Sequence, residues 1–78
     1  MRYQLELTLR RAEGVLARVL GTTERRGFRP LAVDGTTNPE DGNWTLRMTV
    51  EGERSDSSLQ QQLAKLYDCV SVSVQPCP

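Results

Sequence analysis

The chain has 78 residues, 37% of them hydrophobic, and its ten basic side chains balance ten acidic ones. This length predicts a single domain, whose small core supplies only about 3–5 kcal/mol of net stability. Zero net charge argues against a nucleic-acid binder, because such proteins usually carry a basic excess. No apolar run approaches the ~18 residues that cross a membrane, and the first residues lack the apolar stretch of a secretory signal. A cytoplasmic protein is therefore expected.

The composition also limits the chemistry. Histidine is absent, which removes the commonest general base and metal ligand near neutral pH. The two cysteines, Cys69 and Cys77, are too few for a disulfide framework and fit no zinc-binding spacing. We interpret Cys69 as a small apolar residue at an element boundary and Cys77 as a thiol of the tail. No metal or cofactor is expected in this chain.

A strand and then a helix are predicted for the first third of the chain. Apolar residues occupy every second position from Tyr3 to Leu9, which predicts a strand over residues 2–10 with one buried face. The apolar stripe of a helix over residues 14–26 follows, formed by Val15, Leu16, Val19 and Leu20. Gly27 is suited to end this helix, because glycine adopts positive φ without penalty.

Two further strands are predicted in the middle of the chain. The second strand spans Phe28 to Val33, and Pro30 places it at a sheet edge, because proline cannot donate a ladder hydrogen bond. Residues 36–43 are rich in turn formers and predict a wide hairpin loop. A third strand with alternating apolar and polar residues begins at Trp44 and is closed by Gly52.

The last part of the chain predicts a second helix and a fourth strand. The side-chain oxygen of Ser55 or Asp56 is expected to cap the helix. The apolar stripe of this helix consists of Leu59, Leu63, Leu66 and Tyr67. In the final strand three valines alternate with polar residues, and the strand ends at Pro76 and Pro78.

The resulting order is βαββαβ, and two right-handed crossovers convert it into the ferredoxin-like fold of the α+β class. This predicts a two-layer sandwich, with both helices on one face of an antiparallel four-stranded sheet. The first and third strands are expected at the centre and the other two at the edges. We expect one domain over residues 1–78, with a core at about 2–75 and a tail at 76–78.

This fold hosts many functions, so particular residues must decide between them. An RNA-recognition module would carry aromatic residues on the open faces of the central strands, where this chain has none. A metal chaperone would need paired cysteines after the first strand, where the chain reads Arg10-Arg11-Ala12-Glu13. A small phosphate hydrolase would use Arg10, Arg11 and Asn43, although the two arginines are more simply interpreted as solvated loop residues.

Charge is distributed unevenly along the chain. Residues 10–29 contain six arginines and two acidic residues, whereas residues 30–78 contain three basic and seven acidic ones. Arginine is the basic side chain best suited to bidentate pairing at protein interfaces. The first helix therefore presents either a partner-binding basic face, with Arg18 and Arg25, or a merely solvated one. Replacing either arginine is expected to spare folding.

Two stretches resemble the ACT domain, the small regulatory module of amino-acid metabolism. Residues 13–21, Glu-Gly-Val-Leu-Ala-Arg-Val-Leu-Gly, and residues 25–28, Arg-Arg-Gly-Phe, are similar to the first helix of acetolactate (acetohydroxyacid) synthase small subunits. Residues 62–68, Gln-Leu-Ala-Lys-Leu-Tyr-Asp, resemble the second helix of that family. The resemblance covers about residues 10–74, and the brevity of the chain resembles the single-ACT small subunit of the isozyme II type.

The resemblance implies a non-catalytic chain that binds and activates a large catalytic subunit. That subunit carries thiamine diphosphate, Mg and FAD, and condenses pyruvate with pyruvate or 2-oxobutyrate in valine, leucine and isoleucine synthesis. An ACT–ACT homodimer is also implied, with Arg29, Leu31 and Val33 near its seam, although this edge could equally meet the catalytic subunit. The alternative is a free-standing ACT domain that senses an amino acid without a synthase partner.

In relatives that sense valine, the effector lies near the loop before the first helix. The corresponding residues here are Arg11, Ala12, Glu13, Gly14, Val15 and Leu16. Free amides at a helix start attract a carboxylate, and Gly14 permits close approach of the backbone. However, Arg11 replaces the usual asparagine, and Glu13 replaces a proline and would repel the effector's carboxylate. We therefore expect weak or absent control by valine, as the isozyme II type also implies.

Overall fold

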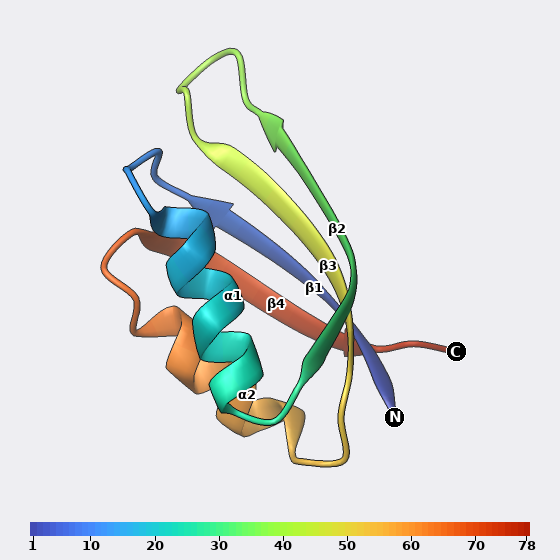
Figure 1. The fold of residues 1–78 in the computed structure, drawn as a ribbon. Helices are drawn as coiled ribbons and strands as arrows, with labels where there is room; N and C mark the ends of the chain where they lie inside the picture. Colours follow the sequence, from blue (N-terminus) through green and yellow to red (C-terminus); the bar gives the residue numbers. More distant parts are fainter.

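The computed structural model describes all residues from 1 to 78. Six elements follow one another in the predicted order (Figure 1): β1 (Arg2–Leu9), α1 (Val15–Arg25), β2 (Arg29–Thr37), β3 (Trp44–Glu51), α2 (Asp56–Ala64) and β4 (Cys69–Pro76). The final strand includes Pro76 and so extends one residue beyond the expected core. The amide of Cys77 then donates to the carbonyl of Arg2 at 2.9 Å.

The four strands form one antiparallel sheet in the order β2-β3-β1-β4. Figure 1 shows both helices on the same face of this sheet. The predicted two-layer ferredoxin-like fold is therefore confirmed, with β1 and β3 at the centre and β2 and β4 at the edges.

The core lies between the helices and the two central strands. Twelve hydrophobic residues are buried there: Tyr3, Leu5, Leu7, Leu9, Val15, Val19, Phe28, Leu46, Met48, Val50, Leu59 and Leu63. The register pairs Leu5 with Met48 and Leu7 with Leu46, so the apolar positions of β1 and β3 share one face. The residues that alternate with them on the central strands, on the open face, are polar and include no aromatic side chain. Nothing on these two strands offers the stacking platform of an RNA-recognition module.

Both ends of α1 depend on a glycine. Gly14 occupies the N-cap position with φ of 77°. At the other end Gly27 has φ of 88°, its amide donates to the carbonyl of Glu24, and the amide of Phe28 donates to that of Thr23. This pair of bonds is the Schellman motif, which requires the left-handed conformation that glycine adopts freely. The predicted role of Gly27 is confirmed.

The second strand is longer than predicted. It begins at Arg29 and continues to Thr37, because Thr36 and Thr37 pair with Thr45 and Trp44 of β3 rather than joining the loop. The β-branched threonines suit an extended strand. The turn itself is confined to Asn38–Asn43, where the amide of Asn38 donates to the carbonyl of Asn43 at 2.7 Å.

The second helix is shorter than predicted. It ends at Ala64, so Tyr67 is not part of its apolar stripe and is 89% exposed. Turn hydrogen bonds from the amides of Leu66 and Cys69 replace the last helical turn. Ser55 occupies the N-cap position, but its side chain makes no capping bond, because its hydroxyl lies 2.7 Å from that of Ser57. Neither helix has the length and apolar character needed to span a membrane.

Leu63 and Leu16 provide a matched test of this packing. Leu63 is fully buried in the core, whereas Leu16 is only partly buried at its margin. We expect Leu63→Ala to lower the free energy of unfolding by about 2–5 kcal/mol. The same truncation at Leu16 should cost only about 1 kcal/mol, because less apolar surface returns to water. Urea unfolding followed by circular dichroism measures both, and equal losses would contradict this assignment of the core.

Candidate functional site

The expected effector loop forms one wall of a shallow hollow. Arg11, Ala12 and Glu13 line this hollow together with Trp44 at the start of β3, and its volume is about 490 Å³. The hollow is open to solvent, and the three loop residues are all exposed. Its lining offers one cation, one carboxylate and an indole ring.

The start of α1 has free backbone donors. The amide of Val15 donates to the carbonyl of Ala12 at 3.2 Å and that of Arg18 to Gly14 at 3.0 Å, whereas the amides of Leu16 and Ala17 have no backbone acceptor. Val15 itself points into the core and is 4% exposed. The loop and first turn therefore contribute backbone groups and the side chains of Arg11 and Glu13 to this region.

Arg18 occupies the space beside Gly14. Its Nη1 donates to the carbonyl of Glu13 at 3.1 Å, and a Cβ placed on Gly14 would lie 3.1 Å from the same nitrogen. The close approach that glycine permits here is thus made by a guanidinium of the chain itself. Gly14 is required by its positive φ and by this contact together.

The same guanidinium holds the turn before β4. Nη2 of Arg18 donates to Oδ2 of Asp68 at 2.7 Å, and the Asp68 side chain is only 12% exposed. Arg10 binds the backbone of this turn. Its amide donates to the carbonyl of Asp68 at 2.8 Å, and its Nη1 donates to the carbonyl of Tyr67 at 2.9 Å. The loop before α1 and the turn before β4 therefore form one hydrogen-bonded unit.

The second strand leaves its outer edge and much of its surface uncovered. Every residue of β2 except Pro30 is exposed, including Leu31 at 43% and Val33 at 45%. The register skips Leu31, which makes it the extra residue of a β-bulge. Beside this strand an apolar groove of about 320 Å³ is lined by Leu16, Val33, Gly35, Thr37, Trp44 and Leu46.

Arg29 and Arg2 share one carboxylate on the open face of the sheet. Nη2 of Arg29 lies 2.8 Å from Oε1 of Glu51, and Nε of Arg2 lies 3.1 Å from Oε2. The hydrogen bonds from Arg2 and then Arg29 hold the pKa of Glu51 below its ordinary value of 4.5, although limited burial opposes them. This cluster joins the starts of β1 and β2 to the end of β3.

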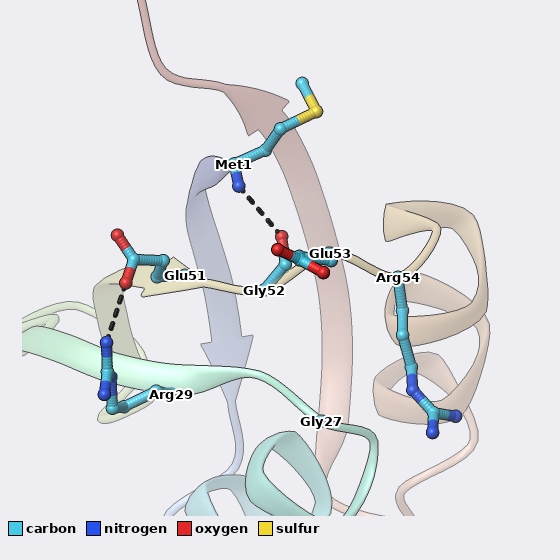
Figure 2. A pocket seen from close by; sticks show the side chains of 7 residues that line it. All are labelled: Met1, Gly27, Arg29, Glu51, Gly52, Glu53 and Arg54. Atoms are coloured by element: carbon cyan, nitrogen blue, oxygen red, sulfur yellow. Dashed lines mark hydrogen bonds and ion pairs between the residues drawn. The ribbon is translucent and has the colours of Figure 1, made fainter.

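A second hollow, of about 570 Å³, lies at the other end of β3 from the effector loop (Figure 2). Its charged lining includes Arg29 and Arg54. Figure 2 shows that Arg29 turns toward Glu51, while Arg54 extends away from both. Arg54 covers Gly27, where a Cβ would lie 3.0 Å from its Nε. The two cations do not converge on one point, so this hollow is not a built anion site.

The structure brings together only some of the expected site residues. Leu16 and Val33 line the same groove, and Leu31 lies on the same strand as Val33. Arg25 lies at the other end of α1 from the effector loop and donates to the hydroxyl of Thr22 at 3.2 Å. The sequence did not predict Asp68 and Trp44 as site residues. The only signal for Asp68 was its place at the end of the motif at residues 62–68.

The remaining reactive groups offer no metal centre. The structure contains no cluster of three His, Cys, Asp or Glu side chains that could hold a metal ion. Both cysteines are free and stand at opposite ends of β4, with Cys69 opposite Leu9 and Cys77 beside Arg2. Burial raises the pKa of the Cys69 thiol, which favours its protonated form.

The sequence pattern of the ACT domain matches residues 11–72. The chain therefore belongs to the ACT domain family, whose members are regulatory and non-catalytic. No protein of curated function matches the chain significantly.

Several solved structures share this fold. The acetolactate synthase small subunit of Thermotoga maritima superposes with a TM-score of 0.84 and 22% identity, over 100% of this chain and 50% of that one. The ACT domain of a Chlorobium tepidum GTP pyrophosphokinase gives 0.76 and 14%, over 95% and 96% of the two chains. Formyltetrahydrofolate deformylase of Burkholderia mallei gives 0.77 and 14%, over 97% of this chain and 28% of that one. These likenesses concern the fold.

Because Asp68 is nearly buried, the structure changes the expectation for Arg18. Arg18→Met keeps the aliphatic stem but leaves the Asp68 carboxylate without its partner. We expect a loss of about 1–2 kcal/mol in the free energy of unfolding, since the Arg18 end of the pair is half exposed and screened. Arg25→Met, which removes only a contact along the helix, should change it by less than about 0.5 kcal/mol. Equal urea midpoints for both variants would show that the Arg18–Asp68 pair contributes nothing.

The Arg2–Glu51–Arg29 cluster predicts a pH-dependent contribution to stability. Because the pKa of Glu51 is lower in the folded chain, its ion pairs stabilise the fold above about pH 4.5 and are lost as the pH falls through the folded value. Glu51→Gln should therefore unfold at lower urea than the wild type at about pH 7, and the difference should shrink as the pH falls below about 4.5 and vanish once Glu51 is protonated in the folded chain. Glu53→Gln, which removes an unpaired neighbouring carboxylate, serves as the control and should show no such change.

Proposed function

We propose that the chain is the regulatory small subunit of an acetolactate synthase in branched-chain amino-acid biosynthesis. The observation that carries this proposal is the pair of helix signatures at residues 13–28 and 62–68. The superposition of the whole chain on the Thermotoga small subunit supports it. A cytoplasmic location belongs to the same proposal.

The structure separates the signature residues that the fold uses from those it does not. Gly27 and Phe28 build the end of α1, and Asp68 anchors the turn before β4. Arg25 and Arg26, by contrast, are exposed and make no ion pair. Since folding does not require these two guanidiniums, they are available to bind a partner subunit.

One ACT domain over residues 1–78 is the unit proposed to act. The chain spans about half the length of the Thermotoga subunit, so the likeness concerns that half of the protein. The proposed partner is the large catalytic subunit, which would carry the thiamine diphosphate, Mg and FAD. The small subunit contributes no catalytic residue and acts by binding.

A homodimer through β2 is part of the proposal. The strand has a free outer edge, whose backbone groups can extend the sheet into a second copy. Arg29, Leu31 and Val33 would lie near this seam, and the groove beside Val33 would be covered. Pro30 removes one donor from the edge, and the bulge at Leu31 interrupts its register.

The effector loop favours insensitivity to valine. The Glu13 side chain stands directly before the helix start, where it disfavours an incoming carboxylate. Arg18 already fills the space beside Gly14 and donates a hydrogen bond to the carbonyl of Glu13. A free-standing amino-acid sensor, the alternative function, would need this same space for its ligand.

Reconstitution tests the proposal directly. The purified chain is mixed with the large acetolactate synthase subunit of its own organism, and acetolactate formation and co-elution are measured. We expect a several-fold rise in activity and little change on adding valine. Arg25→Gln/Arg26→Gln should fold normally but activate less, because only the two unpaired guanidiniums are lost.

Absence of both activation and co-elution would refute the synthase assignment. Calorimetry against the twenty amino acids then identifies the alternative, since a free-standing sensor binds one of them tightly.

A further inference from the structure

Apart from Met1 at the start of the chain, the large exposed apolar side chains form two groups. Leu31 and Val33 lie on β2, and Tyr67 and Val70 lie where the chain enters β4. Because β2 and β4 are the opposite edges of the sheet, these groups face opposite sides of the domain (Figure 1). The β2 pair belongs to the proposed dimer seam, whereas nothing yet accounts for the other pair.

Tyr67 is a free ring on a fixed backbone. Its side chain is 89% exposed, yet its carbonyl accepts from Arg10 at 2.9 Å. The next residue, Asp68, is fixed by two hydrogen bonds. Its carbonyl accepts from the amide of Arg10 at 2.8 Å, and its carboxylate accepts from Nη2 of Arg18 at 2.7 Å. An aromatic side chain on a rigid turn loses little conformational entropy on binding, which is the property of an interface anchor.

Val70 is aimed outward by a β-bulge. The pairing of β4 with β1 passes from Ser71 opposite Thr8 to Cys69 opposite Leu9, so Val70 has no partner strand residue. Its side chain is 49% exposed, whereas Val72 and Val74 pack against the core. Bulges commonly re-aim a side chain at a site of function.

The charge around this turn is positive. Asp68 pairs with Arg18. Two further cations lie near the turn and make no ion pair: Arg10, which contacts the turn, and Lys65, which precedes Tyr67 by two residues. A symmetric contact between two copies of this surface would bring like charges together. A partner with carboxylates around an apolar pocket would be attracted instead.

We propose that Tyr67, Val70 and Arg10 form a second docking surface for the catalytic subunit, in addition to Arg25 and Arg26 at the other end of α1, and that the facing surface of that subunit is an apolar pocket rimmed by acidic residues. This inference rests on the proposed function and completes it. Two copies joined through β2 would carry these surfaces at the two outer ends of the shared sheet, because β4 lies farthest from β2. Self-association and partner binding would thus use different edges.

Binding of the large subunit to the full-length chain, measured by biolayer interferometry, tests the docking surface. Tyr67→Ala should raise Kd roughly tenfold or more, as loss of an interface anchor does, and leave the urea midpoint unchanged, because the ring packs against little of the fold. Tyr67→Phe keeps the ring and should bind as the wild type does. Val33→Asp, at the opposite edge, should weaken self-association in sedimentation while each chain still binds the large subunit.

The outcomes separate this inference from the proposed function. If the wild type binds and Tyr67→Ala binds equally well, the docking surface is wrong and the proposed function stands. If Tyr67→Ala loses self-association instead of partner binding, a second copy occupies the surface, and the assignment to the catalytic subunit is overturned. If the wild type itself does not bind the large subunit, the proposed function fails, and this inference fails with it.

Discussion

The ion pair between Arg18 and Asp68 joins parts of the chain that lie 50 residues apart. One guanidinium reaches the Asp68 carboxylate at 2.7 Å and the carbonyl of Glu13 at 3.1 Å. It thereby fixes the loop before α1 against the turn before β4, and the two bonds from Arg10 close the same unit. Without this pair, only the two bonds from Arg10 would join the loop to the turn, and the nearly buried Asp68 carboxylate would lose its partner.

The second strand contributes little to the buried core of the domain. β1 and β3 place their apolar sides in the core, whereas β2 is exposed along nearly its whole length. Its hydrogen bonds to β3 keep it in the sheet, but Leu31 and Val33 leave 43% and 45% of their surface exposed to water. Apolar surface on an edge strand is a liability for an isolated domain. It becomes stabilising as soon as a second protein covers it.

The fold could be predicted from the sequence because its determinants are periodic. Alternating apolar residues in β1 and β3 specify one buried face each, and Gly27 marks a helix end by a conformation that few other residues adopt. The site depends on contacts that carry no such period. Asp68 contacts Arg18 only because the turn before β4 packs against the start of α1. Tyr67 is not part of the predicted apolar stripe, because two turn hydrogen bonds take the place of the last helical turn. The spacing of apolar residues in the sequence cannot distinguish a side chain that packs in the core from one that is exposed on the surface.

That distinction also gives a rule for weighing a resemblance at low identity. Signature positions on which the fold itself depends, such as Gly27 and Asp68, support the fold more than the partner. Arg25 and Arg26 satisfy no such requirement, since neither makes an ion pair in the folded chain. Their presence in the synthase-like motif is therefore the part of the resemblance that bears on a partner. Arg25 lies on the last turn of α1 and Arg26 is its C-cap, at the opposite end of that helix from the effector loop. A partner contact there would leave the effector loop free, which agrees with the proposed subunit that does not respond to valine.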